Sequence, residues 1–163
     1  MVQNPAASAS PVLVHGTCIA LGPYAALLRG PSGSGKSDLA LRFLALAPEE
    51  VGPAKLVADD QVCLAHSGTS LQVSPPGKLK GLIEVRGLGI QPVPFIASAR
   101  LVVVCDLVRA EDVPRMPPDP WDHTDLAGAK IPALKIAPFE ASAPLKLKMA
   151  IIAATAHLRE AKQ

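Results

Sequence analysis

Apolar residues in this chain gather into short runs that are separated by glycine, proline and small polar residues. Runs of about 4–8 apolar or β-branched residues between such turn formers are typical of strands. The segment Leu101–Leu107 (LVVVCDL) gives the clearest signal and predicts a central strand. Further strands are predicted at Val12–Val14, Thr17–Leu21, Ala25–Arg29, Lys55–Asp60, Gln61–His66, Thr69–Val73 and Ile131–Ile136, with strand-like alternation in Leu82–Ile90.

Two longer segments predict helices. One is Asp38–Leu46, and the other is Pro144–Ala161, which begins with the proline that a first helical turn favours. The second helix carries an apolar face formed by Leu145, Met149, Ile152 and Leu158. We expect the first strands to form a small β meander and Pro114–Pro120 to form a surface loop. The predicted fold class is α/β, a mixed β-sheet with flanking helices.

Composition narrows the class of protein. A chain of 163 residues with 49% hydrophobic content suits one globular domain, predicted over residues 11–163 after a flexible leader at residues 1–10. No segment approaches the roughly 18–20 apolar residues of a membrane span, so no membrane partner is expected. A net charge of +2 without a basic stripe argues against nucleic acid. Cys18, Cys63 and Cys105 are far apart and odd in number, which favours reduced core thiols in the cytoplasm.

The segment GPSGSGKS matches the phosphate-binding loop pattern G-x-x-x-x-G-K-[ST] at every fixed position. A predicted strand precedes it and a predicted helix follows it, which is the context that this motif requires. Backbone N–H groups of such a loop converge on phosphate, the lysine meets the β and γ phosphates, and the final hydroxyl can ligate Mg²⁺. The sequence therefore predicts an ATP and Mg²⁺ site formed by Gly30, Pro31, Ser32, Gly33, Ser34, Gly35, Lys36 and Ser37.

Most phosphate-loop enzymes also use an acid at the end of an apolar strand, and two candidates are present. Asp106 ends the apolar run Val102–Cys105, whereas Asp59 and Asp60 follow Leu56–Ala58 about twenty residues after the loop. The residues alone leave this choice open.

Four motifs in order resemble a known family. They are His15-Gly16, the phosphate loop, Ala58-Asp59-Asp60 and Glu84–Ile90 (EVRGLGI), and together they are similar to the catalytic domain of HPr kinase/phosphorylase over roughly residues 11–160. The resemblance implies an ATP-dependent protein-serine kinase that modifies HPr, the phosphocarrier of the sugar phosphotransferase system. In many members the same domain removes that phosphate by attack of inorganic phosphate, which yields pyrophosphate. It also implies a nucleotide site like that of phosphoenolpyruvate carboxykinase and a homo-oligomer, by family a hexamer.

The resemblance also implies roles for individual residues. Asp60 becomes the general base that accepts the proton of the attacking serine hydroxyl, and Asp106 becomes a structural acid. Glu84 becomes the second protein ligand of Mg²⁺ beside Ser37. His15 would tune the proton affinity of the carboxylates or contact phosphate, and Asp59 would orient the metal shell. Arg115 would neutralise charge on the transferred group. The remaining implied site residues are Arg86, Gly87 and Gly89 of the EVRGLGI segment.

Some features depart from the family pattern. Met116-Pro117-Pro118 stands where the family has a glycine-containing loop after its arginine, and Lys130–Ile136 matches only loosely the segment used in dephosphorylation. Kinase activity is thus favoured over phosphorylase activity, in a compact form reduced to the catalytic domain. Two alternatives stay open: a regulatory ATP-binding module, and a carboxykinase-like kinase of a small molecule.

Overall fold

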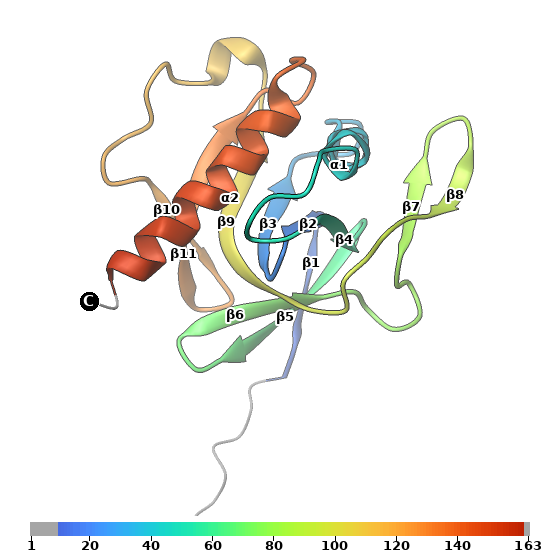
Figure 1. The fold of residues 1–163 in the computed structure, drawn as a ribbon, viewed down its shortest axis with the longest axis horizontal. Helices are drawn as coiled ribbons and strands as arrows, with labels where there is room; N and C mark the ends of the chain where they lie inside the picture. Colours follow the sequence, from blue (N-terminus) through green and yellow to red (C-terminus); the bar gives the residue numbers. More distant parts are fainter. Residues whose placement is uncertain (1–9, 162–163) are drawn as a thin grey trace, which may run out of the picture.

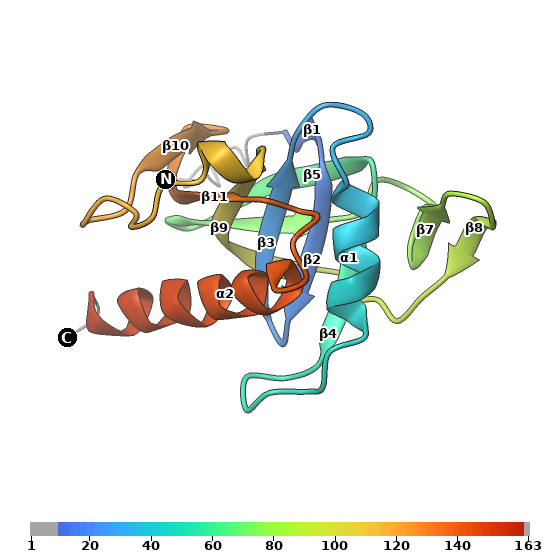
Figure 2. The same cartoon turned by 90° about the horizontal axis from the view of Figure 1, so that it is seen from above.

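The computed structural model describes residues 10–161, which form a curled mixed sheet with two helices packed on one of its faces (Figures 1 and 2). The leader predicted at residues 1–10 lies, apart from residue 10, outside the described residues. The strands of the large sheet are β1 Val12–His15, β2 Thr17–Leu21, β3 Tyr24–Arg29, β4 Ala54–Ala58, β5 Gln61–Ser67, β6 Ser70–Ser74, β9 Ala99–Leu107, β10 His123–Leu126 and β11 Ala129–Ile136. The helices are α1 Lys36–Leu44 and α2 Ala143–Glu160, with a 3₁₀ turn at Ala110–Asp112, and a separate hairpin joins β7 Leu82–Val85 to β8 Gly89–Pro92.

Strand β9 is the centre of the sheet, which confirms the prediction from its apolar run. Along one edge of β9, Ala99 and Arg100 pair with β6 and Val104 to Leu107 pair with β11. Along its other edge, β9 pairs with β3. The pairs with β3 and β11 are parallel and the pair with β6 is antiparallel. One long strand therefore joins the parallel region under the helices to the antiparallel strands that curl away from it (Figure 1).

Both faces of the central strands are buried. In β3, Ala26 and Leu28 join the core beneath the two helices, whereas Ala25 and Leu27 join the core beneath β5 and β6. Side chains alternate between the two faces of a strand, so a strand covered on both sides must be apolar at every position. Because β3 is packed on both faces, its C-terminal end, where the phosphate loop begins, is held in one position.

The predicted β meander at the start of the chain is confirmed for β2 and β3, which pair as an antiparallel hairpin, but it is wrong for β1. Strand β1 pairs with β5, with His15 opposite Gln61, while β2 pairs with β3 and β4. Only Gly16 separates β1 from β2, and a hairpin turn commonly needs at least two residues. The chain therefore passes from one part of the sheet to another, and His15 lies on a strand that does not neighbour the phosphate-loop strand.

Helix α2 docks on the sheet with a different face from the one that its large apolar residues suggest. Leu147, Ile151 and Ala154 are buried, whereas Leu145, Met149 and Ile152 are exposed and Leu158 is only partly buried. The helix carries apolar residues on two sides, and the side with more alanines allows the closer approach to the sheet. Within residues 10–161, no helix is long and apolar enough to cross a bilayer.

The three thiols are free, and their reactivity gives a first prediction. Cys18 and Cys105 are fully buried, and burial raises the pKa of the Cys105 thiol to about 12, with a smaller contribution from Asp106, and raises that of Cys18 further. We expect Ellman's reagent at pH 8 to modify only the half-buried Cys63 in the native protein and all three thiols in denaturant. Because both folded-state pKa values lie above the unfolded value, this contribution to stability is complete at neutral pH and declines above about pH 8.5. Rapid modification of two or more thiols in the native state would contradict this burial.

Candidate active site

The phosphate loop connects the end of β3 to the start of α1, as the motif predicted. Gly35 has φ 94°, a left-handed conformation that glycine adopts without strain, and it caps α1. A Cβ added at Gly30 would lie 2.5 Å from the Ser34 hydroxyl, so the first glycine permits the tight closure of the loop. The helix therefore begins at Lys36, inside the motif and two residues before the predicted start, and its positive end faces the loop.

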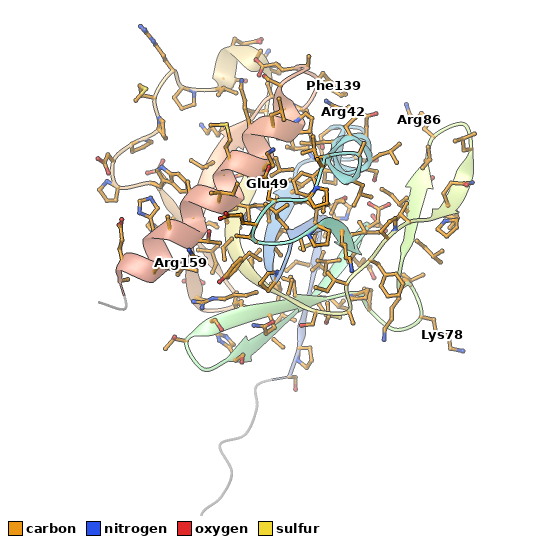
Figure 3. All side chains as sticks on the ribbon, viewed as in Figure 1. Arg42, Glu49, Lys78, Arg86, Phe139 and Arg159 are labelled. Atoms are coloured by element: carbon orange, nitrogen blue, oxygen red, sulfur yellow. The ribbon has the colours of Figure 1, made fainter. Side chains whose placement is uncertain are left out.

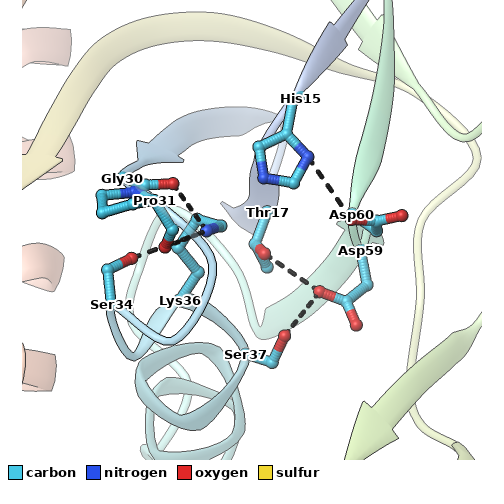
Figure 4. A network of polar contacts seen from close by, with 9 residues as sticks. All are labelled: His15, Thr17, Gly30, Pro31, Ser34, Lys36, Ser37, Asp59 and Asp60. Carbon is cyan, nitrogen blue, oxygen red and sulfur yellow. Dashed lines mark hydrogen bonds and ion pairs between the residues drawn. The ribbon is translucent and has the colours of Figure 1, made fainter.

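Lys36 is folded across the mouth of the loop (Figure 4). Its ammonium group donates hydrogen bonds to the carbonyl oxygens of Gly30 at 2.7 Å and Pro31 at 3.0 Å, and it lies 3.5 Å from the Ser34 hydroxyl. The residue is only 8% exposed, so the charge is held in place by these oxygens. The loop thus presents a fixed cation beside the N-terminus of a helix, an arrangement that suits a polyphosphate.

Asp59 connects three segments of the site. Its Oδ1 accepts hydrogen bonds from the hydroxyls of Ser37 at 2.8 Å and Thr17 at 2.9 Å, and its Oδ2 accepts one from the backbone N–H of Glu84 at 3.1 Å. The phosphate loop, β2 and the start of the β7–β8 hairpin therefore meet at one carboxylate. This position holds the Ser37 hydroxyl in one orientation.

Asp60 directs the second carboxylate into the same cleft. Consecutive side chains of a regular strand point to opposite faces, but Asp60 has φ 70° and so turns the chain out of the strand. Its carbonyl accepts a hydrogen bond of 3.0 Å from the N–H of Gly16, which holds β1 beside it. As a result His15 Nδ1 lies 3.4 Å from Asp60 Oδ1 (Figure 4). The pairing of β1 with β5, rather than proximity to the phosphate-loop strand, brings the histidine to the carboxylate.

These groups share a cleft of about 460 Å³. It runs from the phosphate loop and the first turns of α1 to the β7–β8 hairpin. Its lining includes Ser32, Gly33, Gly35, Lys36 and Ser37 of the loop, Asp38 and Leu41 of α1, Phe139 beside Gly35, and His15, Thr17, Asp59, Asp60, Glu84, Val85 and Arg86 from the other segments. The cleft thus brings three other motifs together with the loop, although they lie up to about fifty residues from it in the sequence.

Three predicted site residues outside the phosphate loop do not line this cleft, and Gly30, Pro31 and Ser34 of the loop, which contact the Lys36 ammonium, are also absent from its lining. Gly87 and Gly89 lie at the exposed tip of the β7–β8 hairpin, where an added Cβ would meet nothing within 4 Å. Arg115 is exposed in the loop between the 3₁₀ turn and β10. In this structure that loop lies on the α2 and β10 side of the molecule, away from the β7–β8 hairpin (Figure 1).

The competing acid, Asp106, is engaged elsewhere. The Arg29 guanidinium donates to both of its carboxylate oxygens, at 2.8 and 3.0 Å, and also lies 3.3 Å from the Thr124 hydroxyl. Asp106 is absent from the lining of the cleft. Of the two candidate strand-end acids, the Asp59-Asp60 pair therefore lies in the cleft, and Asp106 forms an ion pair between β9 and β3.

This assignment makes a prediction. Asp106→Ala should lower the free energy of unfolding by about 1 kcal/mol, because it removes the partly buried ion pair in which Arg29 donates two hydrogen bonds to Asp106. ATP affinity should stay within about twofold of the unchanged protein because the pair lies outside the cleft. Urea denaturation and a nucleotide titration measure the two effects, and a large loss of ATP affinity with an intact fold would return Asp106 to the site.

Sequence reasoning missed Thr17 and Phe139. Thr17 is fully buried beside Asp59, and a lone threonine in an apolar strand gives no signal of that contact. Phe139 reaches the phosphate loop from a segment about a hundred residues later, which hydrogen bonds from Arg42 of α1 hold beside the loop. Neither position could be read from local pattern.

The donors of the cleft suit Mg²⁺. Between residues 10 and 161, no group of three or more His, Cys, Asp and Glu side chains could by itself hold a metal ion. The cleft instead offers the Ser37 hydroxyl and the Glu84 carboxylate, both hard oxygen donors. Mg²⁺ typically takes one or two protein oxygens and completes its shell with phosphate and water, so this sparse set fits an ion that arrives with a nucleotide.

The fold and the cleft define an α/β protein in which an acidic pair lies in the same cleft as a loop that matches the phosphate-binding pattern. The family model described as the HPr Serine kinase C-terminal domain matches residues 7–138, and the chain belongs to that family. The chain is 32% identical over 139 residues to the HPr kinase/phosphorylase of Cupriavidus metallidurans and 39% identical over 82 residues to that of Mycoplasmopsis pulmonis. These matches cover 79% and 50% of this chain but only 41% and 25% of the two relatives.

A solved structure gives the same fold. The structure of the Hpr(Ser) kinase/phosphatase from Coxiella burnetii superposes with a TM-score of 0.73 and 21% identity, and the match covers 91% of this chain and 99% of that one. The mixed sheet with flanking helices predicted from sequence is thereby confirmed.

Proposed function

We propose that this chain is an ATP-dependent protein-serine kinase whose substrate is an HPr-type phosphocarrier protein. The observation that carries the proposal is the convergence of the phosphate loop, the Asp59-Asp60 pair and Glu84 on one cleft. Membership of the family and the names of the curated relatives support the choice of HPr. The chain spans less than half the length of those relatives, so family membership alone does not assign it the activity of the whole relative proteins.

The proposed reaction is a direct transfer. The serine hydroxyl oxygen of HPr forms a bond to the γ-phosphorus of ATP while the bond from that phosphorus to the β,γ-bridging oxygen breaks, and ADP leaves. The hydroxyl proton passes to the Asp60 carboxylate, which lies exposed at the open side of the cleft, where a protein substrate can reach it. Lys36 and the loop amides bind the negative charge of the β and γ phosphates.

His15 and Asp59 are proposed as positioning residues. His15 lies 3.4 Å from the Asp60 carboxylate and so limits the directions in which that base can turn. Asp59 holds the Ser37 hydroxyl through a bond of 2.8 Å. Ser37 and Glu84 would hold Mg²⁺, which when bound neutralises phosphate charge and aligns the phosphates.

The roles predicted from the sequence for Arg86 and Arg115 are also proposals. Arg86 lies at the rim of the cleft, where a cation can meet the phosphate or the acidic parts of a partner. For Arg115 to stabilise the transferred group, its loop would have to move or act on a neighbouring subunit, so its role depends on the predicted homo-oligomer. Phosphorylase activity with inorganic phosphate, hexamer formation and a cytoplasmic location likewise remain predictions.

The experiment is incubation of the chain with γ-labelled ATP, Mg²⁺ and purified HPr, followed by phosphoamino-acid analysis. We expect label on serine of HPr, and none on HPr in which the acceptor serine is replaced by alanine. ATP binding without turnover on any acceptor would favour a regulatory nucleotide-binding module. Unlabelled HPr with phosphate transfer to a metabolite would favour a small-molecule kinase.

A further inference from the structure

Phe139 is an exposed aromatic residue at one end of the cleft. The chain has only five aromatic residues, Tyr24, Phe43, Phe95, Trp121 and Phe139, and Phe139 alone among them lines the cleft. It is 72% exposed, which is unusual for a phenyl side chain in a segment that is otherwise tightly held. Ligand pockets are lined largely by apolar and aromatic side chains with a few polar groups, so a phenyl ring exposed in the lining of a polar cleft offers a surface that a ligand can cover.

The segment that carries Phe139 is firmly anchored. The Arg42 guanidinium donates hydrogen bonds to the carbonyl oxygens of Pro138 and Glu140, the residues on either side. Arg42 is itself paired with Asp38 at 3.0 Å on α1, and Glu140 is paired with Lys146 at 2.5 Å on α2. Both helices therefore hold the loop, and the aromatic ring is presented in one place (Figure 3).

The ring lies directly beside the phosphate loop. A Cβ built at Gly35 would come within 3.0 Å of two carbon atoms of the ring, and so the ring edge packs against this glycine. The lining of the cleft thus divides into a cationic part, the Lys36 ammonium at the helix N-terminus, and an apolar part, the Phe139 ring and Leu41. A ligand that is anionic at one end and flat and aromatic at the other matches this division.

We propose that Phe139 is the platform on which the base of the nucleoside triphosphate stacks. The inference rests on the proposed function, because the phosphates must first occupy the loop. Stacking on an aromatic side chain contributes on the order of 1–3 kcal/mol per base and tolerates different bases, because every base has a π-face. ATP and GTP should therefore use this surface alike, while inorganic tripolyphosphate should not use it.

The experiment measures the affinities of Mg²⁺-ATP, Mg²⁺-GTP and Mg²⁺-tripolyphosphate by calorimetry for the unchanged protein and for Phe139→Ala. We expect the substitution to weaken ATP and GTP about 5- to 100-fold and to leave tripolyphosphate within about twofold. Phe139→Trp should keep the affinity for ATP because it keeps an aromatic face. Met149→Ala, which removes a side chain that is 66% exposed on α2 and outside the cleft, should change none of the three affinities.

The outcomes separate this inference from the proposed function. If the unchanged protein binds neither ATP nor tripolyphosphate, the proposed function fails. If it binds both and Phe139→Ala binds ATP equally well, the stacking role is wrong while the phosphate site stands. If Phe139→Ala loses affinity for ATP and for tripolyphosphate equally, the ring only supports the loop. If its ATP affinity is normal but its KM for HPr is raised, the ring contacts the protein substrate. Each of these two results also contradicts the inference.

Discussion

Asp60→Asn should lower the rate of serine phosphorylation roughly 10²- to 10⁴-fold, the usual effect of removing a general base. Asparagine has nearly the same shape and also tolerates the left-handed conformation that Asp60 adopts at φ 70°, so the backbone of the cleft should be preserved. The amide cannot accept the hydroxyl proton. Since Asp60 makes no hydrogen bond to the phosphate loop, nucleotide affinity should stay nearly unchanged. Single-turnover transfer to HPr gives the rate, and a fluorescent nucleotide titration gives the affinity.

A matched control for Asp60→Asn is Asp106→Asn, which neutralises a strand-end acid that lies outside the cleft. It should retain near-normal turnover. If Asp60→Asn transfers phosphate at a similar rate to the control, Asp60 is not the base. If it loses ATP affinity as severely as a phosphate-loop variant, its role is binding and not proton transfer.

Lys36→Ala should weaken ATP binding on the order of 100-fold or more and abolish transfer with it. The ammonium group is held at the loop mouth by two carbonyl oxygens at 2.7 and 3.0 Å, and a charge-assisted hydrogen bond contributes roughly 1.5–3 kcal/mol. When a nucleotide binds, the ammonium group would exchange these carbonyl contacts for bonds to the β and γ phosphates, and two charge-assisted bonds account for an effect of this size. Equilibrium binding of Mg²⁺-ATP and the HPr transfer assay measure both losses.

Lys78→Ala is the control for charge, because it removes the same positive charge from an exposed loop far from the site (Figure 3). It should leave ATP affinity and transfer unchanged. Circular dichroism must show that Lys36→Ala keeps its secondary structure, since the lysine also binds the loop carbonyls. A folded Lys36→Ala protein that binds ATP normally would mean that the loop is not the nucleotide site.

The sequence predicted local elements better than their partners. Apolar runs and turn residues predict the strand at Leu101–Leu107, the strands at Gln61–His66 and Thr69–Val73, and the helix after the phosphate loop, and the structure confirms them. The pairing of β1 with β5 could not be read in this way, because it depends on where the curled sheet brings the chain back. Strand β10 was also missed, since its sequence HTDL is polar and it pairs only with β11 at the sheet edge.

The site shows the same division. Motif order identified the loop, the acidic pair and Glu84, and the structure brings them to one cleft. The residues alone left the choice between Asp60 and Asp106 open, and the family resemblance favoured Asp60; the structure places Asp60 in the cleft and pairs Asp106 with Arg29. Phe139 could not be predicted, since its approach to Gly35 results from the anchoring of its loop by Arg42.

A crystal structure with Mg²⁺ and a non-hydrolysable ATP analogue tests the central claim most directly. We expect the triphosphate in the Gly30–Ser37 loop, the metal at Ser37 and Glu84, and the Asp60 carboxylate facing the γ-phosphate at the open side of the cleft. A γ-phosphate that faces Asp106, or a nucleotide bound outside this loop, would contradict the account.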